Sequence, residues 1–483
     1  MALFDNVWFY NILLCIVLFY LLIAITFAAH FSACDQFARP VLLNSFNLFS
    51  CFFISLLFWL FCFDFLPNDR LYFFSQNIQL LFIFFMVCVL YASYDFLNDK
   101  KILKYEYDLL FIFIILSGVC LCFCNEFLML YLAIELQSLT LYIFATFNRN
   151  SEFSTESGLK YFVFGGIMSC FLLFGICLIY LFFGSLSFEL FFSIANSGFD
   201  LIFFAGFLFV FIVLMFKVGA APFHFWLCDV YEGAILPVTL LFASAPKVVL
   251  FSVFLKLCCF VLYDYNTVWV NFIGLSALLS IIVGSISGLY QKRLKRLFAF
   301  STIVHAGFVL LALLAFSIDA SKSLILYISI YFVLTITLFS ILMNAAVTTT
   351  VPPKYLINYS SIGSKNYIFA ITFCLVILSV AGIPPLAGFF SKLFVLISVI
   401  GSQYYSVALI TIFFSSISCF YYIRLVKILF FAEKNCKNDI WITNNTTKNT
   451  QNIIGVFLFF ILYFFVYPDL VIDFSFVVGL IFF

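Results

Sequence analysis

The sequence predicts an all-α membrane protein with about fourteen transmembrane helices. Of its 483 residues, 66% are hydrophobic and 9% are charged, whereas a soluble domain carries about 25% charged residues. Apolar stretches of about 20 residues, the length of a membrane-spanning helix, recur along the whole chain, which favours helices over a barrel. Because the linkers between them are short, we expect one compact helical unit without a soluble domain.

The expected spans can be placed in order, and two of them have features of their own. The first, Val7–Ala29, has no basic segment before it, so we expect it to be retained rather than cleaved. The twelfth is overlong and is interrupted by Gly382-Ile383-Pro384-Pro385, which predicts a broken helix. The fourteen spans cover residues 7–29, 43–66, 78–97, 108–124, 126–147, 158–183, 200–222, 235–260, 268–289, 298–317, 322–345, 367–396, 401–430 and 452–476.

Basic residues in the loops predict the orientation. The loops after the odd-numbered spans contain fourteen Lys and Arg residues, whereas the opposite side, with both termini, contains only Arg70 and Lys322. Positive charge is retained on the side from which a chain inserts. Both termini should therefore face outward, toward an intermembrane space or a periplasm.

Composition also limits the chemistry and the source. The net charge of +1 gives no indication of nucleic-acid binding. The 16 cysteines lie mostly within apolar runs, where they act as small hydrophobic side chains, and no spacing among them suits a metal. We therefore expect no metal or redox cofactor in this chain. The 75 phenylalanines indicate an AT-rich coding sequence, which favours an organellar gene.

The stretch from Phe211 to Lys247 carries the strongest functional signal. Lys217 interrupts an apolar run there, and an ammonium at membrane depth costs roughly 2.5–3.5 kcal/mol on insertion scales. Pro222 follows and cannot continue a helical ladder, so the helix should break just after the charge. A broken helix beside an intramembrane charge is typical of an ion-transport site.

An internal repeat relates two parts of the chain. Span 5 carries Glu135 and span 10 carries His305, while span 7 carries Lys217 and span 12 carries Lys392. Spans 7 and 12 also share a break that contains Gly and Pro. An offset of five helices places the second copy upside down, and such inverted repeats are found in many secondary transporters.

Glu135 and Lys217 are expected partners. Burial disfavours the charged form of each, whereas pairing stabilises both charged forms. A lysine whose proton affinity depends on a nearby carboxylate is a switchable proton site; the alternative is a static ion pair that fixes helix packing. Lys247 and Lys392 are also too far from the span ends to reach the interface easily. Because such charges recur at repeat-related places, we favour the proton site.

The remaining polar groups near the spans have more modest expected roles. His305 is expected to relay protons near neutral pH, and His224, beside the break, to be a hydrogen-bonded interior residue. Asp229 and Glu232 can either cap helices or guide protons, and we prefer capping; the role of Arg424 is left open. Three basic side chains near span ends are expected to extend to the interface: Lys160, Lys256 and Lys427.

Four segments, 131–166, 216–247, 291–308 and 380–396, carry a family resemblance. They resemble the antiporter-like membrane subunits of proton-pumping NADH:quinone oxidoreductase, respiratory complex I, and in particular the subunit 2, or bacterial N, family. The lysine in the twelfth span and the short segment after the last span separate it from the other two antiporter-like subunits. One departure, Ile235-Leu236 in place of a Pro-Thr pair, alters a loop and leaves the charges intact.

The resemblance implies an antiporter-like fold of two inverted five-helix bundles with broken helices 7 and 12. The divisions would be a three-helix segment (1–100), a first repeat (101–262), a second repeat (263–430) and a C-terminal loop and helix (431–483). It implies that electrostatic changes at Glu135 and Lys217 start proton transfer through internal water. The implied proton path then runs through Lys217, Lys247, His305 and Lys392.

The resemblance also implies the setting. The chain would translocate protons as a subunit of H⁺-translocating NADH:ubiquinone reductase, while FMN, iron–sulfur clusters and quinone are bound by other subunits. Expected partners are the other membrane-arm subunits, including the neighbouring antiporter-like ones, and membrane lipids such as cardiolipin. The expected location is the mitochondrial inner membrane, or the bacterial plasma membrane if the gene is not organellar.

Three alternatives stay open from the sequence. The first is a subunit of a cation/proton antiporter, and co-purification with flavin and iron–sulfur subunits would exclude it. The second is the plastid relative that takes electrons from ferredoxin. The third is a membrane scaffold with vestigial charges, against which the presence of all four charged residues, Glu135, Lys217, Lys247 and Lys392, argues.

Overall fold

The structure, a computed structural model, describes residues 70–100, 102, 105–188, 201–349, 353–360, 366–431 and 448–480. Within these ranges the regular structure is helical, and the only β pairing is two isolated bridges, Glu126 with Ser187 and Arg293 with Tyr355. The expected spans 7–29 and 43–66 lie outside the described residues.

The described part of the chain is an all-helical membrane protein. Eight of its helices are long and apolar enough to cross a membrane. The helices are α3 (Arg70–Asp99), α4 (Tyr105–Cys122), α5 (Phe127–Ala145), α6 (Glu152–Phe183), α8 (Leu201–Val218), α9 (Phe225–Gly233), α10 (Leu236–Ala243), α11 (Ala245–Lys256), the π-helical turn η1 (Leu257–Val261), the short η2 (Tyr263–Tyr265), α12 (Asn266–Leu289), α13 (Leu294–Leu314), α14 (Ile318–Thr348), α16 (Tyr367–Ala381), α17 (Ala387–Gly401), α18 (Tyr405–Phe431), α19 (Lys448–Tyr463) and α20 (Asp469–Gly479).

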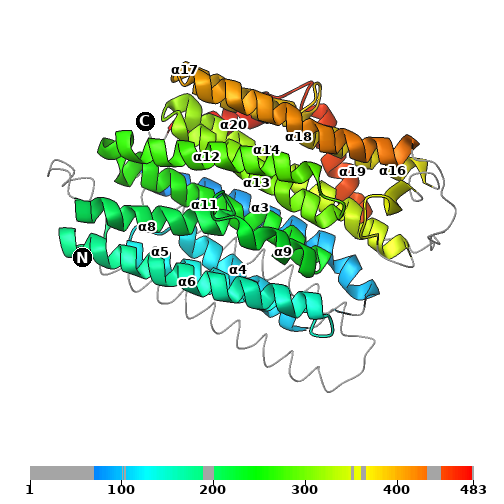
Figure 1. Cartoon of the computed structure of the whole chain (residues 1–483), viewed down its shortest axis with the longest axis horizontal. Coiled ribbons are helices and arrows are strands. Elements are labelled where there is room, and N and C mark those ends of the chain that lie inside the picture. Colours follow the sequence, from blue (N-terminus) through cyan, green and yellow to red (C-terminus); the bar gives the residue numbers. More distant parts are fainter. Residues whose placement is uncertain are drawn as a thin grey trace.

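The helices lie side by side in a bundle with α11, α13 and α14 near its centre (Figure 1). α10 packs against α11 and α14. In the apolar segments of α13 and α14, 94% of the residues are buried, whereas in those of α6 and α18 only 28% are buried. The difference identifies α6 and α18 as peripheral helices. Their outer faces are apolar, as expected for contact with lipid or with other membrane subunits.

Two helix breaks share one backbone pattern. α8 ends before Gly219 (φ +83°), and α16 ends before Gly382 (φ +85°). Each glycine N–H donates to the carbonyl four residues earlier, and the next residue's N–H donates to that same carbonyl. This left-handed C-terminal turn favours glycine. The shared turn pairs Pro222 with Pro385, each three residues after its glycine and each preceded by a cis peptide bond.

The break places the two lysines of the broken helices differently. Lys217 belongs to the last turn of α8, before its break, whereas Lys392 lies in α17, after its break. The two residues therefore lie in corresponding broken spans but not at equivalent positions in them. Side chains before and after such a break have different surroundings, so the two lysines need not have the same function.

The span expected at 235–260 is broken, which the sequence interpretation missed. α10 ends at Ala243, Ser244 leaves the helical conformation (φ −109°, ψ −119°), and α11 begins at Ala245. Pro246 lies in the first turn of α11, where its missing N–H costs nothing. Lys247 consequently lies at the start of a helix instead of in its middle.

The span expected at 452–476 also differs from the prediction of one helix. The structure divides it into α19 and α20, and Pro468 immediately precedes α20. A proline inside a helix removes a hydrogen bond and clashes with the preceding turn. Its position explains why the apolar run is not continuous in structure.

Candidate functional site

Lys217 lies in the last turn of α8 and is 8% exposed. Its Nζ stands over the ring of Tyr142 on α5, 5.7 Å from the ring centroid. Among the described residues, this Nζ has no hydrogen-bond partner. The face of an aromatic ring attracts a cation, but less strongly than a carboxylate does. The ammonium is thus held in place without being neutralised.

Glu135 on α5 is close enough to Lys217 for the two charges to interact. Within the described chain, however, the ion pairs do not include one between these two side chains. The Ser138 hydroxyl donates to the Glu135 backbone carbonyl at 3.0 Å and lies 3.4 Å from Oε2. The geometry therefore differs from a static ion pair that fixes helix packing.

A small cavity connects Lys217 with Lys247. It provides about 20 Å³ of room, enough for one water molecule. Gln137 and Ser138 of α5 line it together with the two lysines. In the part of the chain that the structure describes, Gln137 Nε2 and Lys247 Nζ, like Lys217 Nζ, are buried without a hydrogen-bond partner. Three unpartnered donors around one such cavity provide a binding place for a water oxygen.

Lys392 on α17 has a different environment. Its Nζ donates a hydrogen bond of 2.7 Å to the backbone carbonyl of Ala381, the last residue of α16. It also stands 5.6 Å from the ring centroid of Phe308. The C-terminal end of a helix carries partial negative charge, which favours a cation there. Lys392 is 8% exposed, and it is anchored although it is buried.

His305 on α13 is within electrostatic range of a lysine on α11 and a lysine on α17. It is 5% exposed, and Lys247 and Lys392 are the charged groups close enough to act on it. Its Nδ1 is 2.7 Å from the Tyr327 hydroxyl. Within the described ranges, Nε2 is buried and has no hydrogen-bond partner. Of the residues expected on one axis, the structure brings Lys247, His305 and Lys392 together.

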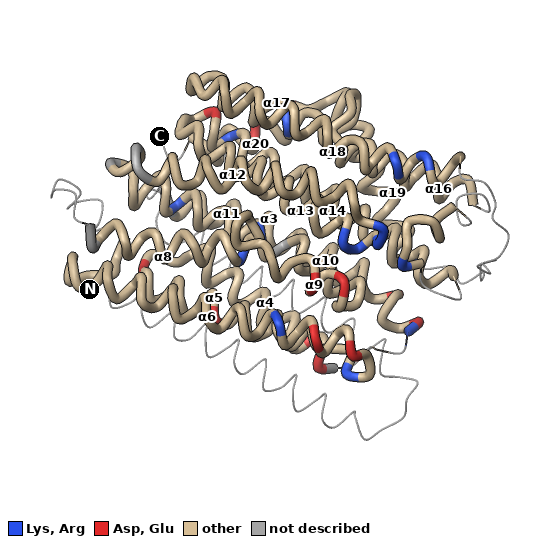
Figure 2. Tube along the Cα trace, viewed as in Figure 1, with Lys and Arg blue, Asp and Glu red and all other residues tan. Residues whose placement is uncertain are grey.

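Asp229 and Glu232 of α9 form an ion-pair network at one end of the bundle. Asp229 pairs with Lys160 of α6 and Arg296 of α13, both at 3.2 Å. Glu232 pairs with Arg293 and Arg296. The expectation that these acids cap helices is therefore wrong. Figure 2 shows red and blue segments close together around α9 and near the start of α6, while further charged segments lie elsewhere in the bundle.

Several basic side chains instead bind the C-terminal carbonyls of helices. Arg424 of α18 donates to the carbonyl of Leu289, the last residue of α12, at 2.9 Å, and to that of Gln291. Lys256 of α11 is 3% exposed and donates to the carbonyl of Cys122, the last residue of α4. Lys256 does not extend to an interface as expected, because an open helix end lies within its reach.

His224 lies beside the break, as expected. The residue is half-buried, and its ring lies 4.8 Å from that of Phe225. Its Nδ1 is buried and has no hydrogen-bond partner in the described chain. The backbone of Pro222 acts on the ring as a hydrogen-bond partner, in line with the expected hydrogen-bonded interior histidine.

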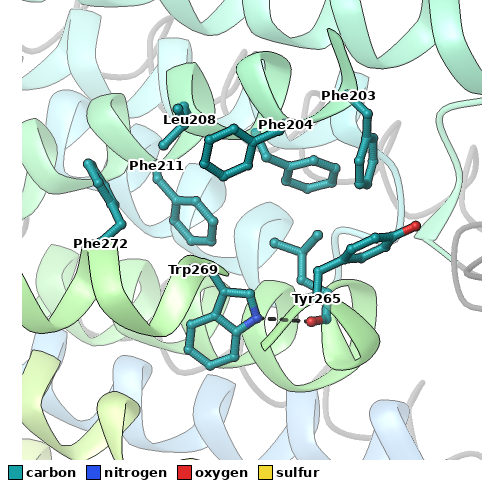
Figure 3. Close-up of a pocket in the computed structure, with 9 residues that line it drawn as sticks. Phe203, Phe204, Leu208, Phe211, Tyr265, Trp269 and Phe272 are labelled. Carbon is teal, nitrogen blue, oxygen red and sulfur yellow. Dashed lines mark hydrogen bonds between the residues drawn. The ribbon is translucent and has the colours of Figure 1, made fainter. Parts of the chain in front are cut away.

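A second pocket is lined only by apolar and aromatic side chains from α8, η2 and α12 and by Leu262, which lies between η1 and η2 (Figure 3). Trp269 closes one side, and its Nε1 donates to the carbonyl of Leu262 at 2.9 Å. The pocket offers no charged group for a cofactor. Among the described residues there is no group of His, Cys, Asp or Glu that could hold a metal ion.

Sequence reasoning missed three residues of the site. Pro246 breaks the helix ahead of Lys247, and the Ala-Pro-Lys sequence was the signal for it. Gln137 lies only two positions from Glu135, so its amide points to a different part of the helix surface. Tyr327 had no signal, because a tyrosine in an apolar span is usually a packing residue.

Comparison with known proteins identifies relatives of the chain. Residues 124–418 match the family described as NADH:quinone oxidoreductase/Mrp antiporter, TM. The chain is 34% identical to the NADH-ubiquinone oxidoreductase chain 2 of Marchantia polymorpha, over 78% of this chain and 76% of the relative. It is 33% identical to the NADH-quinone oxidoreductase subunit N of Pelagibacter ubique, over 80% of this chain and 82% of the relative.

Solved structures give the same fold. A chain of respiratory complex I from Thermus thermophilus with bound Aureothin matches with a TM-score of 0.73 and 23% identity, over 94% of this chain and 98% of that one. A chain of the Mrp complex from Dietzia matches with a TM-score of 0.82 and 15% identity, over 97% of this chain and 96% of that one. The fold is therefore antiporter-like.

Proposed function

The chain belongs to the NADH:quinone oxidoreductase/Mrp antiporter family, and from this premise we propose that it is the proton-translocating subunit 2, or N, of the membrane arm of respiratory complex I. Electron transfer from NADH to ubiquinone takes place in other subunits, which bind FMN, iron–sulfur clusters and quinone. This chain uses the energy of that reaction to move protons across the membrane.

The observation that carries the proposal is the cavity shared by Lys217 and Lys247. Both amines are buried without a partner among the described residues, and room for one water lies beside them. The proton affinity of a buried amine depends on its desolvation and on the charges close to it. The two lysines can therefore hold and release protons, and a water between them provides the transfer step.

The proton path is proposed to continue from Lys247 through His305 to Lys392. His305 is polar, buried and close to both lysines. Glu135 sets the proton affinity of Lys217 through its charge. Because the two side chains do not form an ion pair, the distance between them can change, and the proton affinity changes with it. Pro222, Pro384 and Pro385 keep the helices broken beside the path.

We infer that residues 101–262 and 263–430 are inverted repeats, with 1–100 and 431–483 as flanking segments. The shared turn at Gly219 and Gly382 supports this division. The charge distribution of the loops supports termini that face the intermembrane space of mitochondria, or the periplasm in a bacterium. Membrane partners would be the neighbouring antiporter-like subunits and lipids such as cardiolipin, and the apolar outer faces of α6 and α18 suit both.

A subunit of a cation/proton antiporter is the second candidate. The likeness to a chain of the Mrp complex favours it at the level of the fold. The higher identity to chain 2 and subunit N relatives favours the complex I proposal.

A native gel of the source membranes in mild detergent tests the proposal. In-gel NADH oxidation and mass spectrometry should find this chain in a large NADH-oxidising band with flavin and iron–sulfur subunits. If the chain instead migrates alone or with a few antiporter-like partners, its function is cation/proton exchange.

A further inference from the structure

The shortest contact of His305 is to a residue that the proposed path does not use. The Tyr327 hydroxyl on α14 lies 2.7 Å from His305 Nδ1, and the Tyr327 side chain is 1% exposed. A neutral hydroxyl can both donate and accept a hydrogen bond, and it can reverse its direction by rotation. A buried group of this kind at one ring nitrogen determines what the other nitrogen can do.

We propose that Tyr327 is a further proton-transfer residue, which exchanges a proton with His305 Nδ1 while Nε2 exchanges one with the charged path. The inference rests on the proposed proton-translocating function. His305 Nε2 is buried and, in the described chain, has no hydrogen-bond partner, so it is the nitrogen available to a water from the lysine side. Lys247 of α11 and Lys392 of α17 are the charges that face the ring.

The transfer balances in protons and needs no electron. A proton arrives at Nε2 as the Nδ1–H bond breaks, and that second proton moves to the Tyr327 oxygen. In the same concerted step Tyr327 releases its own hydroxyl proton to the next oxygen. The buried hydroxyl of Tyr422 on α18 lies within electrostatic range of Tyr327. It can be that oxygen only if it releases its own hydroxyl proton to an internal water in the same step, so that neither phenol keeps an extra proton. Rotation of the hydroxyl and exchange of the histidine tautomer then reset the pair.

Tyr331 provides a matched control on the same helix. Its ring contacts His305 at a centroid distance of 5.0 Å, and the residue is 8% exposed. Its hydroxyl has no hydrogen-bond partner among the residues that the structure describes. Tyr327→Phe removes a hydroxyl that contacts His305, whereas Tyr331→Phe removes one that does not. Both variants keep an aromatic ring in place.

The test compares these variants in the assembled complex, reconstituted into lipid vesicles with NADH and a quinone. The readout is the number of protons moved per NADH oxidised, with complex content from native gels and electron transfer measured with an uncoupler. Tyr327→Phe should lower the proton number at normal content and normal uncoupled electron transfer, while Tyr331→Phe should leave it unchanged. In a His305→Gln background, Tyr327→Phe should cause no further loss.

The opposite results overturn the inference. A normal proton number in Tyr327→Phe, or an equal loss in both tyrosine variants, would show that only ring packing matters. If Tyr327→Phe fails to assemble, Tyr327→Gln replaces it; this side chain can still hydrogen-bond to the histidine but cannot relay a proton, and normal pumping in it overturns the proposal. Failure of both to assemble also overturns it, since the hydroxyl is then a folding requirement. Lys217→Ala serves as reference: full pumping there would reject the proposed function itself.

Discussion

The ammonium of Lys392 is bound to the backbone carbonyl of Ala381 at 2.7 Å, at the open end of α16. Lys217 and Lys247 are equally buried, yet neither has a hydrogen-bond partner within the described residues. Lys392 is thus hydrogen-bonded to a helix end, whereas Lys217 and Lys247 are available to hydrogen-bond to water. This difference leads to predictions that separate the structural contribution of Lys392, a path residue that also binds a helix end, from that of the other two lysines.

Lys217→Ala should lower proton pumping by at least about tenfold, equivalent to about 1.4 kcal/mol in the transfer barrier, while assembly survives. The variant removes a proton carrier and leaves only a small apolar side chain. Glu135→Gln should act in the same direction, because it removes the charge that sets the proton affinity of Lys217. Pumping in vesicles and complex content on native gels check both. Full pumping in both variants at normal content would reject this assignment.

Lys392→Met should destabilise the subunit more than Lys247→Met, by about 1–3 kcal/mol, the cost of a buried polar group left without its partner. The first substitution leaves the Ala381 carbonyl unpaired, whereas the second removes an amine that has no partner in the described chain. Thermal dissociation of the subunit from the purified complex measures the difference. Equal stability of the two variants would contradict the role of Lys392 as an anchor.

Gly165→Ala should reduce pumping by up to about tenfold, and Gly166→Ala should not. A Cβ at residue 165 would lie 1.9 Å from the Tyr142 hydroxyl, whereas one at residue 166 meets nothing within 4 Å. The first substitution therefore pushes Tyr142 away from its position under Lys217. Both substitutions lie in α6 and add the same methyl group. A similar loss in the two variants would point to a general effect on α6.

Arg424→Gln should lower the amount of assembled complex but not the protons moved per NADH in the complex that forms. Arg424 binds carbonyls at the end of α12 and is not part of the charged path. Arg424→Lys should recover part of the assembly, since a lysine can still donate to one of the carbonyls. A lower proton number in assembled Arg424→Gln would instead place Arg424 on the path.

The sequence was sufficient for the membrane class and for the buried charges, because apolar length and a charge inside it are local properties. The break after Lys217 could also be predicted, since Pro222 lies in the same segment. The partners of the charged side chains could not be predicted from the sequence. Whether Lys256 reaches an interface or the end of α4 depends on how the chain folds across a sequence separation of 134, and the sequence contains no distance across it.

The pairing of Asp229 and Glu232 with Arg293 and Arg296 was beyond sequence reasoning for the same reason. Acids at a helix end suit capping equally well on local grounds. Only the packing of α9 against α13 decides which interaction forms. The family resemblance, in contrast, was confirmed by relatives at 33–34% identity over most of the chain.

The size of the cavity between Lys217 and Lys247 has a consequence for control. The cavity has room for a single water. Proton transfer between the two lysines is therefore possible when that water is present and stops when it leaves. A side chain that moves into this space excludes that molecule. The subunit can therefore be closed to back-flow without any large rearrangement of its helices.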